Sequence, residues 1–324
     1  MIFFLLVSCE TDKRVFVFLE GFTQGTSYHI AYNSPDSVDY HNEIKEIFEQ
    51  IDNSMSVYNP GSIISEINRD EEDVRPDDYF TRVFNRASEI SAKTGGAFDI
   101  TVAPLVNAWG FGFSKMDSVT PKLIDSLLQF VGWEKVSIEN QVFVKDHPGI
   151  MLDMNAIAKG FTVDVVAEFF ESKGIKDYMV EIGGEIRLKG MNRNNQLWRI
   201  GIDKPVEDPA VISRELQEVL QMTGRSMATS GNYRRFYVKD GQRYAHTIDP
   251  VTGYPVQHNL LSATVLTNTC MDADAWATAF MVMGLERSME FARNIPELEA
   301  YFIYDLNGIS AVAFTEGIKE MIAR

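Results

Sequence analysis

The 324-residue chain has the composition of a folded globular protein, since 45% of its residues are hydrophobic and 23% are charged. Its net charge of −16 argues against a nucleic-acid-binding protein, because such binding depends on neutralising phosphates with Lys and Arg. The same charge requires that a polyanionic substrate be met by a metal cation or by local basic groups. The length suits one large domain or two smaller ones.

The first nine residues, MIFFLLVSC, form an apolar run that is too short to span a bilayer. We interpret residues 1–9 as the remnant of a secretion signal and residues 10–20 as a tether. The segment 6–9, LVSC, resembles a bacterial lipoprotein processing box in which Cys9 becomes the lipidated first residue. The alternative is a buried first strand or helix with an incidental cysteine. The lipoprotein hypothesis predicts anchoring at Cys9 on the extracytoplasmic (periplasmic) face of the bacterial cell envelope.

Hydrophobic periodicity predicts an α+β fold, because helices and hairpins follow one another without a steady β-α-β order. Apolar residues at helical spacing predict helices at 44–51, 80–90, 156–173 and 271–283, and a short one from Pro121. Alternating or apolar runs predict strands at 15–18, 27–31, 179–182, 198–203 and 261–266. Turn sequences at 240–241 and 307–308 predict two hairpins, 236–245 and 301–314. We therefore expect mixed, largely antiparallel sheets with packed helices.

The segment 272–278, DADAWAT, places two oxygen-bearing side chains in an apolar run. Asp274 and Thr278 are four residues apart, so on a helix they lie on one face and can point at one object. Both offer hard oxygen, the ligand type that Mg²⁺ prefers. The same spacing occurs on ordinary solvated helix faces, and taken alone it favours that alternative.

The segment 153–160, DMNAIAKG, opens one of the predicted helices. A helix N-terminus favours anions through its free N–H groups and its dipole, and Lys159 adds a charge suited to phosphate. The alternative is that Asp153 caps the helix and Lys159 is exposed to solvent.

Three other segments carry residues suited to binding or proton transfer. The glycines of 21–28, GFTQGTSY, let backbone approach a ligand, and Tyr58 could stack on an aromatic ligand or simply pack. Residues 94–102, TGGAFDITV, suit a ligand loop or a helix C-cap with core aromatics. His246 precedes a turn-forming DPVTG sequence, which suits a general base at the mouth of a loop, although a lone His is more often structural.

In their residue types and in their order along the chain, these segments resemble the motifs of the ApbE family, the FAD:protein FMN transferases. The resemblance runs from about residue 21 to residue 284. The strongest matches are 153–160, the GGE at 183–185, the TSG at 229–231, 246–250 and 274–278. The resemblance implies an ApbE-like, T-fold-like α+β architecture over residues 21–324, as one domain or as two closely packed subdomains. An N-terminal lipobox is also common in that family.

The resemblance implies Mg²⁺-dependent transfer of FMN from FAD to a Thr or Ser hydroxyl of an acceptor protein, through a phosphoester bond and with release of AMP. Two alternatives remain open. One is hydrolysis of FAD to FMN and AMP at the same site, and the other is a non-catalytic flavin-binding lipoprotein. The implied partners are FAD and an acceptor flavoprotein, with the membrane contacted only through the lipid anchor.

By motif, the resemblance implies that Mg²⁺ is bound by the side chains of Asp274 and Thr278 and by the backbone carbonyl of Ala156. Ala277 stands where some relatives have another acidic ligand, so it could contribute only through its backbone. His246 is implied as the base that removes the proton from the acceptor hydroxyl.

The resemblance also implies a set of flavin contacts along the chain. These are Gln24, Tyr58, Ala97, Phe98, Asp99, Asp153, Lys159, Thr247 and Ile248. The family usually has Met at position 24, so Gln24 departs from its pattern. Lys159 is expected to reach a phosphate or a flavin carbonyl.

Overall fold

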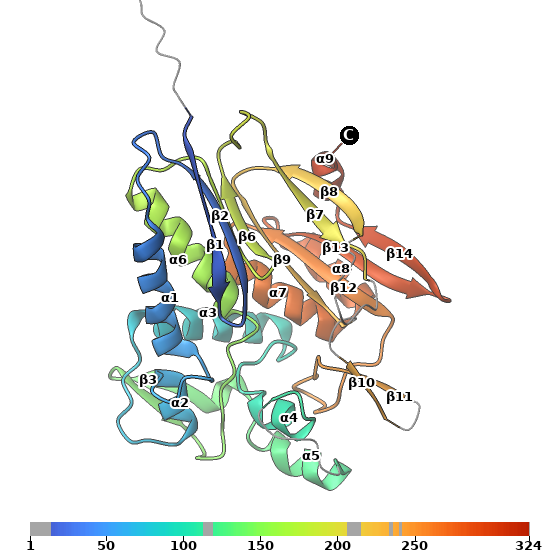
Figure 1. Cartoon of the computed structure of the whole chain (residues 1–324). Helices are drawn as coiled ribbons and strands as arrows, with labels where there is room; N and C mark the ends of the chain where they lie inside the picture. The colour runs from blue at the N-terminus through green and yellow to red at the C-terminus, as the bar shows by residue number, and fades with distance from the viewer. Residues whose placement is uncertain (1–13, 113–118, 206–214, 233–235, 240–241, 324) are drawn as a thin grey trace, which may run out of the picture.

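The computed structural model describes residues 14–112, 119–205, 215–232, 236–239 and 242–323. At its centre lies an eight-stranded sheet in the order β1-β2-β5-β6-β9-β12-β13-β14 (Figure 1). Its strands are β1 (Phe16–Thr23), β2 (Thr26–Asn33), β5 (Tyr178–Ile182), β6 (Glu185–Lys189), β9 (Arg225–Gly231), β12 (Leu260–Thr267), β13 (Glu299–Leu306) and β14 (Ile309–Phe314). Every neighbouring pair in this sheet is antiparallel, which confirms the predicted α+β class.

Three smaller two-stranded sheets accompany the central one. They pair β3 (Val136–Glu139) with β4 (Val142–Lys145), β7 (Trp198–Asp203) with β8 (Leu216–Met222), and β10 (Phe236–Lys239) with β11 (Gln242–Ala245). The β7–β8 pair and α9 (Glu316–Met321) cover one face of the central sheet, where Trp198, Leu220 and Ile318 are buried together with strand residues.

The opposite face of the central sheet is covered by helices (Figure 1). Helices α6 (Ala158–Ser172), α7 (Cys270–Met283) and α8 (Leu285–Asn294) lie on the strands. Helix α1 (His41–Met55) packs against α6, with α2 (Ile63–Asn68) beside it, and α3 (Asp78–Thr94) packs against α1 and α7. Helix α6 lies against β5 and β6, and α7 lies against β9 and β12. The two helices also contact each other, and this contact organises the candidate site.

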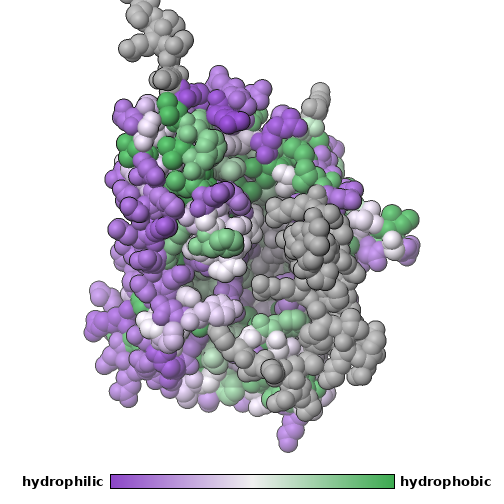
Figure 2. Space-filling model, viewed as in Figure 1, coloured by the Kyte–Doolittle hydropathy of each residue, from purple (hydrophilic) through white to green (hydrophobic). Residues whose placement is uncertain are grey.

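The outer helices are amphipathic, whereas α6 and α7 are largely buried. Helix α3 begins where the Asp77 side chain accepts the Phe80 N–H and ends at Gly95, whose φ of 64° is favoured by glycine. Hydrophilic side chains dominate the side of the molecule over α1 (Figure 2), in keeping with the acidic composition. Among the described residues, no helix combines the length and apolarity needed to cross a membrane.

A small separate core lies under α4 (Ala103–Ala108) and α5 (Pro121–Leu128), next to the short 3₁₀ helix η1 (Trp133–Lys135). It buries Leu105, Trp109, Ile124, Val131 and Ile248. Because Ile248 follows His246 by two residues, this core supports the segment that carries the predicted base.

Two sequence predictions differ from the structure in detail. The helix predicted from residue 156 begins at Ala158, because the φ of Ile157, −149°, is outside the helical range; in the turn before it the Met154 carbonyl accepts the Ile157 N–H. Residues 16–20 of the predicted tether belong instead to β1, where they pair with β2 and Leu19 is buried. Residues 1–13, including Cys9, lie outside the described part of the chain.

Candidate functional site

The first turn of α6 lies against α7 at the segment that carries Asp274. The backbone N–H of Gly160 donates a hydrogen bond to Asp274 Oδ2 at 3.0 Å. A Cβ atom at Gly160 would lie 2.3 Å from the Cys270 carbonyl oxygen and 2.8 Å from Asp274 Cβ, so only glycine permits this approach. The fold therefore brings together two of the predicted segments, 153–160 and 274–278.

This contact leaves the Ala156 carbonyl without the partner that a helix would give it. In an α-helix a carbonyl accepts the N–H four residues later, which here belongs to Gly160. The Gly160 N–H binds Asp274 instead, and within the described ranges no hydrogen bond to the Ala156 carbonyl oxygen is formed. A carbonyl oxygen without a donor and a buried carboxylate near the same turn suit a hard cation such as Mg²⁺.

Thr278 follows Asp274 by four residues on α7 and is half-buried. Its Oγ1 lies 3.2 Å from Ser230 Oγ, so the TSG segment at the end of β9 joins the site. Ala277 is fully buried in α7 and has no side-chain oxygen. Any contact that it makes to an ion would have to come from its backbone.

The half-buried Lys159 places a positive charge between two carboxylates. Its Nζ lies 3.3 Å from Glu185 Oε1 and 3.9 Å from Asp274 Oδ2. Burial tends to lower the pKa of Lys159, but the charges of Asp274 and Glu185 raise it overall, so the side chain stays protonated. An ammonium group in this place suits binding of a phosphate oxygen.

Burial shifts the pKa values of the two carboxyl groups near Lys159 in the same direction. Burial raises the pKa of Asp274, and Lys159 and the Gly160 N–H oppose that rise. Burial also raises the pKa of Glu185, to about 8, with Lys159 opposing the rise and the charge of Asp274 adding to it. Glu185 Oε2 is buried without a hydrogen-bond partner among the described residues, which is costly unless a ligand or ion satisfies it. The sequence indicated Glu185 only as part of the GGE match.

Gln24 reaches the same region from the turn between β1 and β2. It has a φ of 49°, and its Nε2 donates a hydrogen bond to Thr162 Oγ1 on α6 at 2.8 Å. Its Oε1 is buried and, in the described part of the chain, has no hydrogen-bond partner. The structure thus places this predicted flavin contact against the first turns of α6.

Asp153 is linked to the segment 94–102 through its backbone, since its N–H donates to the Ile100 carbonyl at 2.7 Å. Its carboxylate accepts the Asn155 N–H at 2.8 Å, and burial raises its pKa while that hydrogen bond and the charge of Lys159 oppose the rise. Asp153 therefore shapes the turn before α6 and adds negative charge beside Lys159.

The remaining predicted contacts in 94–102 face the interior of the protein. Asp99 accepts the Thr101 N–H and hydroxyl with Oδ1, at 2.8 and 2.7 Å, and the Trp133 N–H with Oδ2 at 2.9 Å. Ala97 and Phe98 are buried. Because these side chains are engaged internally, a flavin contact here would come from the backbone. Tyr58, by contrast, is 74% exposed on the loop after α1.

His246 is half-buried, and its ring centroid lies 6.3 Å from that of Phe111. The next residue, Thr247, donates its hydroxyl hydrogen to Asn232 Oδ1 at 2.5 Å, directly beyond the end of β9. Since Ser230 near the same strand end contacts Thr278, β9 connects the His246 segment to α7. The structure therefore brings the predicted base to the strand end that borders the α6–α7 contact.

The chain after His246 is fixed by a tight turn. Asp249 Oδ1 accepts the Val251 N–H at 2.9 Å, and the Gly253 N–H donates to the Asp249 carbonyl at 2.8 Å. Trp109, directly after α4, donates from Nε1 to the Gly253 carbonyl at 2.8 Å, which attaches the turn to the end of α4. Ile248 packs into the small core, so its side chain contributes to this support and a contact with flavin would use its backbone.

Among the residues that the structure describes, no group of three or more His, Cys, Asp or Glu side chains is arranged to hold a metal ion. The expected ligand set has one carboxylate, one hydroxyl and one backbone carbonyl. Such a set fits Mg²⁺, which usually takes one or two carboxylates and completes its shell with water and substrate phosphates.

Comparisons with known proteins find one family model, and relatives and solved structures that are similar to most of this chain. The sequence model of the ApbE family matches residues 24–302. The FAD:protein FMN transferase of Vibrio cholerae is 42% identical over 296 residues, which covers 89% of this chain and 87% of that protein. The solved structure of the flavin transferase ApbE from Vibrio cholerae is similar with a TM-score of 0.85 and 37% identity, over 95% of this chain and 99% of the other. The apo flavinyl transferase ApbE of Pseudomonas stutzeri is similar with a TM-score of 0.85 and 29% identity, over 95% and 97% of the two chains.

Proposed function

The chain belongs to the ApbE family, and from that premise we propose that it is an FAD:protein FMN transferase. It moves FMN from FAD to a Thr or Ser hydroxyl of an acceptor protein, forms a phosphoester bond and releases AMP. The observation that carries this proposal is the buried contact in which Gly160 binds Asp274 and Lys159 lies beside it. It gathers oxygen ligands and a fixed positive charge at a helix N-terminus, where a diphosphate binds well.

The charge of the FAD diphosphate is the first obstacle to the reaction in a protein of net charge −16. Asp274, Thr278 and the Ala156 carbonyl would hold Mg²⁺, which when bound neutralises diphosphate oxygens. Lys159 binds a phosphate oxygen with its ammonium group, because the N–H groups of Ala158, Gly160 and Phe161 in the first turn of α6 are already bonded within the protein.

The acceptor hydroxyl is a weak nucleophile until its proton is removed. In the proposed step its oxygen attacks the phosphorus of the FMN moiety and forms the new P–O bond. The P–O bond to AMP breaks, and AMP leaves with the bridging oxygen. His246 accepts the hydroxyl proton on a ring nitrogen, a role worth about 10²–10⁴-fold in rate.

Mass spectrometry of a co-expressed candidate acceptor domain tests this function. The full chain with FAD and Mg²⁺ is expected to add one FMN to the acceptor and to release one AMP for each FMN added. Rapid AMP release without an acceptor would instead support FAD hydrolysis, and no AMP release under either condition would support a flavin-binding protein. Asp272→Asn is the matched control for Asp274→Asn, because Asp272 lies on the same helix but pairs with Arg86.

We also propose that the protein is lipid-anchored at Cys9 on the extracytoplasmic face of the cell envelope. The LVSC sequence at 6–9 supports this proposal. Metabolic labelling with a palmitate analogue should label the wild type and not Cys9→Ser, and the variant should leave the membrane fraction. A variant that stays labelled and membrane-bound would refute the anchor.

A further inference from the structure

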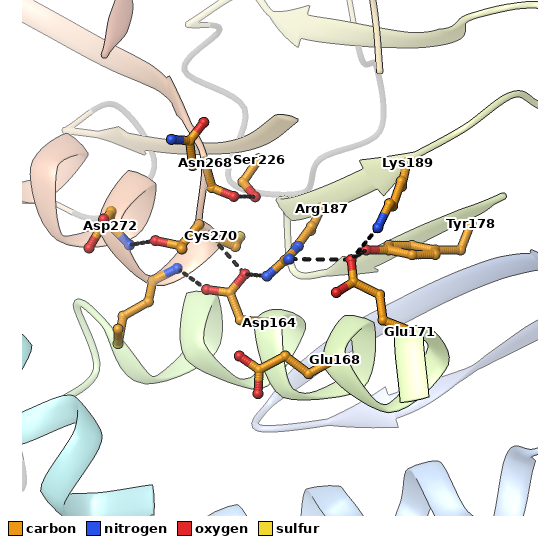
Figure 3. Close-up of polar contacts among 12 residues, drawn as sticks. Asp164, Glu168, Glu171, Tyr178, Arg187, Lys189, Ser226, Asn268, Cys270 and Asp272 are labelled. Atoms are coloured by element: carbon orange, nitrogen blue, oxygen red, sulfur yellow. Dashed lines mark hydrogen bonds and ion pairs between the residues drawn. The ribbon is translucent and has the colours of Figure 1, made fainter. Parts of the chain in front are cut away.

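Helices α6 and α7 each receive a carboxylate from the other at a backbone N–H. The Gly160 N–H of α6 donates to Asp274 of α7 at 3.0 Å. In return, Asp164 of α6 accepts the N–H groups of Cys270 and Met271, the first two residues of α7, at 2.9 and 2.8 Å (Figure 3). The N–H and the carboxylate of this exchange are four residues apart on α6 and three or four apart on α7, so the two contacts fix the register of one helix against the other.

Asp164 is itself held in place by β6. Arg187 Nη1 donates to Asp164 Oδ1 at 2.8 Å, while Arg187 Nη2 lies 3.5 Å from Glu171 Oε1 farther along α6 (Figure 3). Tyr178 and Lys189 hold Glu171 from the other side, at 2.8 and 3.0 Å. Burial raises the pKa of Asp164, and the Arg187 charge and the two N–H groups of α7 oppose that rise.

Capping of α7 does not by itself require Asp164. Thr269 already supplies the N-cap, since its side chain accepts the Asp272 N–H. A second acceptor from another helix adds little to the cap, but it determines where the first turn of α7 lies relative to α6. Asp274 is the fifth residue of α7, so a displacement of that turn also displaces Asp274 from the Gly160 N–H that it accepts.

We propose that Asp164, oriented by Arg187, is a positioning residue that sets the register of α7 and so places Asp274 opposite the Ala156 carbonyl. The inference rests on the proposed function, in which Asp274 binds a divalent cation. Groups that orient a metal ligand without touching the metal typically change affinity by about 10–100-fold.

The test compares Asp164→Asn with Glu171→Gln in the full-length protein. Both substitutions remove one charge from the same network at nearly constant volume, but only Asp164 contacts α7. Binding of Mn²⁺, as a paramagnetic substitute for Mg²⁺, is measured by electron paramagnetic resonance. FAD binding without metal is measured by flavin fluorescence, and thermal unfolding reports folding. We expect D164N to bind Mn²⁺ about 10–100-fold more weakly with unchanged metal-free FAD affinity, and E171Q to match the wild type.

A purely structural role would lower the unfolding temperature of D164N and leave the Mn²⁺ affinity of the folded protein unchanged. Equal Mn²⁺ affinity in wild type and D164N therefore overturns the inference, whether or not the wild type transfers FMN. A wild type that transfers no FMN but binds Mn²⁺ more tightly than D164N would refute the proposed function and still support the inference. If D164N does not fold, the same comparison is made with Asp164→Glu, which keeps the charge but displaces it by one methylene group.

Discussion

The two halves of the proposed site are supported in different ways. The phosphate half lies on two buried helices whose backbone and carboxylates bind each other directly, as Gly160 and Asp274 do. The base half, around His246, lies on a loop that is attached to β9 by Thr247 and to α4 by Trp109. The first half forms part of the main core, whereas the second rests on a small core of its own.

This difference in structural support matches the different tasks of the two halves in the proposed reaction. Binding a diphosphate and a cation requires fixed oxygen and nitrogen positions, which packed helices provide. Accepting a proton from a hydroxyl on another protein requires an accessible side chain, and loops carry such side chains on a rigid scaffold. Damage to the first half should therefore abolish cation binding, and damage to the second should reduce transfer while binding persists.

The largest effect is expected from Asp274→Ala. It removes the one acidic side chain of the expected ligand set, so cation binding and FMN transfer should both fall below detection. Isothermal titration with Mg²⁺ and mass spectrometry of the acceptor measure the two effects. Asp272→Asn, whose parent side chain pairs with Arg86, should retain both. Mg²⁺-dependent transfer by Asp274→Ala would remove Asp274 from the site.

His246→Ala should separate the two halves. We expect FAD and Mg²⁺ affinity to be kept, because no binding group of the α6–α7 contact is changed, while the transfer rate falls by about 10²–10⁴-fold. Flavinylation assays quenched at successive times give the transfer rate, and flavin fluorescence gives the FAD affinity. His147→Ala is the control, since the His147 ring packs on Phe130 in another loop. Near-normal flavinylation by His246→Ala would exclude it as the base.

Gly160→Ala tests how closely the two helices must approach. The added Cβ would meet the Cys270 carbonyl at 2.3 Å, so we expect a loss of about 1–3 kcal/mol in the free energy of unfolding, and weaker Mg²⁺ binding. Gly61→Ala is the control, because its Cβ would have its nearest neighbour, Asn59 Oδ1, at 3.6 Å. A stable Gly160→Ala variant with wild-type Mg²⁺ affinity would show that the close approach is unnecessary.

The smallest effect concerns His258, which joins the loop region to the end of α7. Its Nδ1 accepts the Leu260 N–H and its Nε2–H donates to the Met281 carbonyl, so it is held neutral. Burial lowers the pKa of His258 from its ordinary 6.5, and the contact with Met281 opposes this. Below that pH the unfolded chain binds a proton that the folded protein does not, so stability should decrease as the pH falls from about 6.5 toward the lower folded pKa.

Thermal unfolding between about pH 5 and pH 8 measures this dependence. His258→Gln can still donate to the Met281 carbonyl but does not titrate, so its stability should fall less at acidic pH. An equal decrease in the wild type and His258→Gln would assign the pH dependence to other groups.

Much of the fold follows from local pattern. Helices α1 and α3 were predicted because their apolar residues recur at helical spacing and, in α3, because Gly95 ends the helix. Strand β6 was missed, because its short sequence, EIRLK, directly follows the Gly183-Gly184 turn and carries three charges. Its pairing with β5 is a local hairpin across Gly183-Gly184, whose two glycines were an available turn signal, whereas its pairing with β9 is long-range.

The candidate site could likewise be predicted from the sequence only in part. The Asp274–Thr278 spacing was visible in the sequence, but its meeting with Gly160 joins residues 114 positions apart and depends on packing. Asp164 was missed, although a charged residue between Val163 and Val165 in an apolar helix was an available signal, since buried charges are almost always paired. Its partners, Arg187 and the first turn of α7, come from other parts of the chain.

In the proposed function, the α6–α7 contact binds the diphosphate of FAD together with Mg²⁺. A crystal structure of the protein with FAD and Mg²⁺ tests it most directly. We predict Mg²⁺ at about 2.1 Å from an Asp274 carboxylate oxygen and from the Ala156 carbonyl, with the diphosphate over the first turn of α6 near Lys159. A diphosphate bound elsewhere, with no ion at Asp274, would refute this assignment of the site.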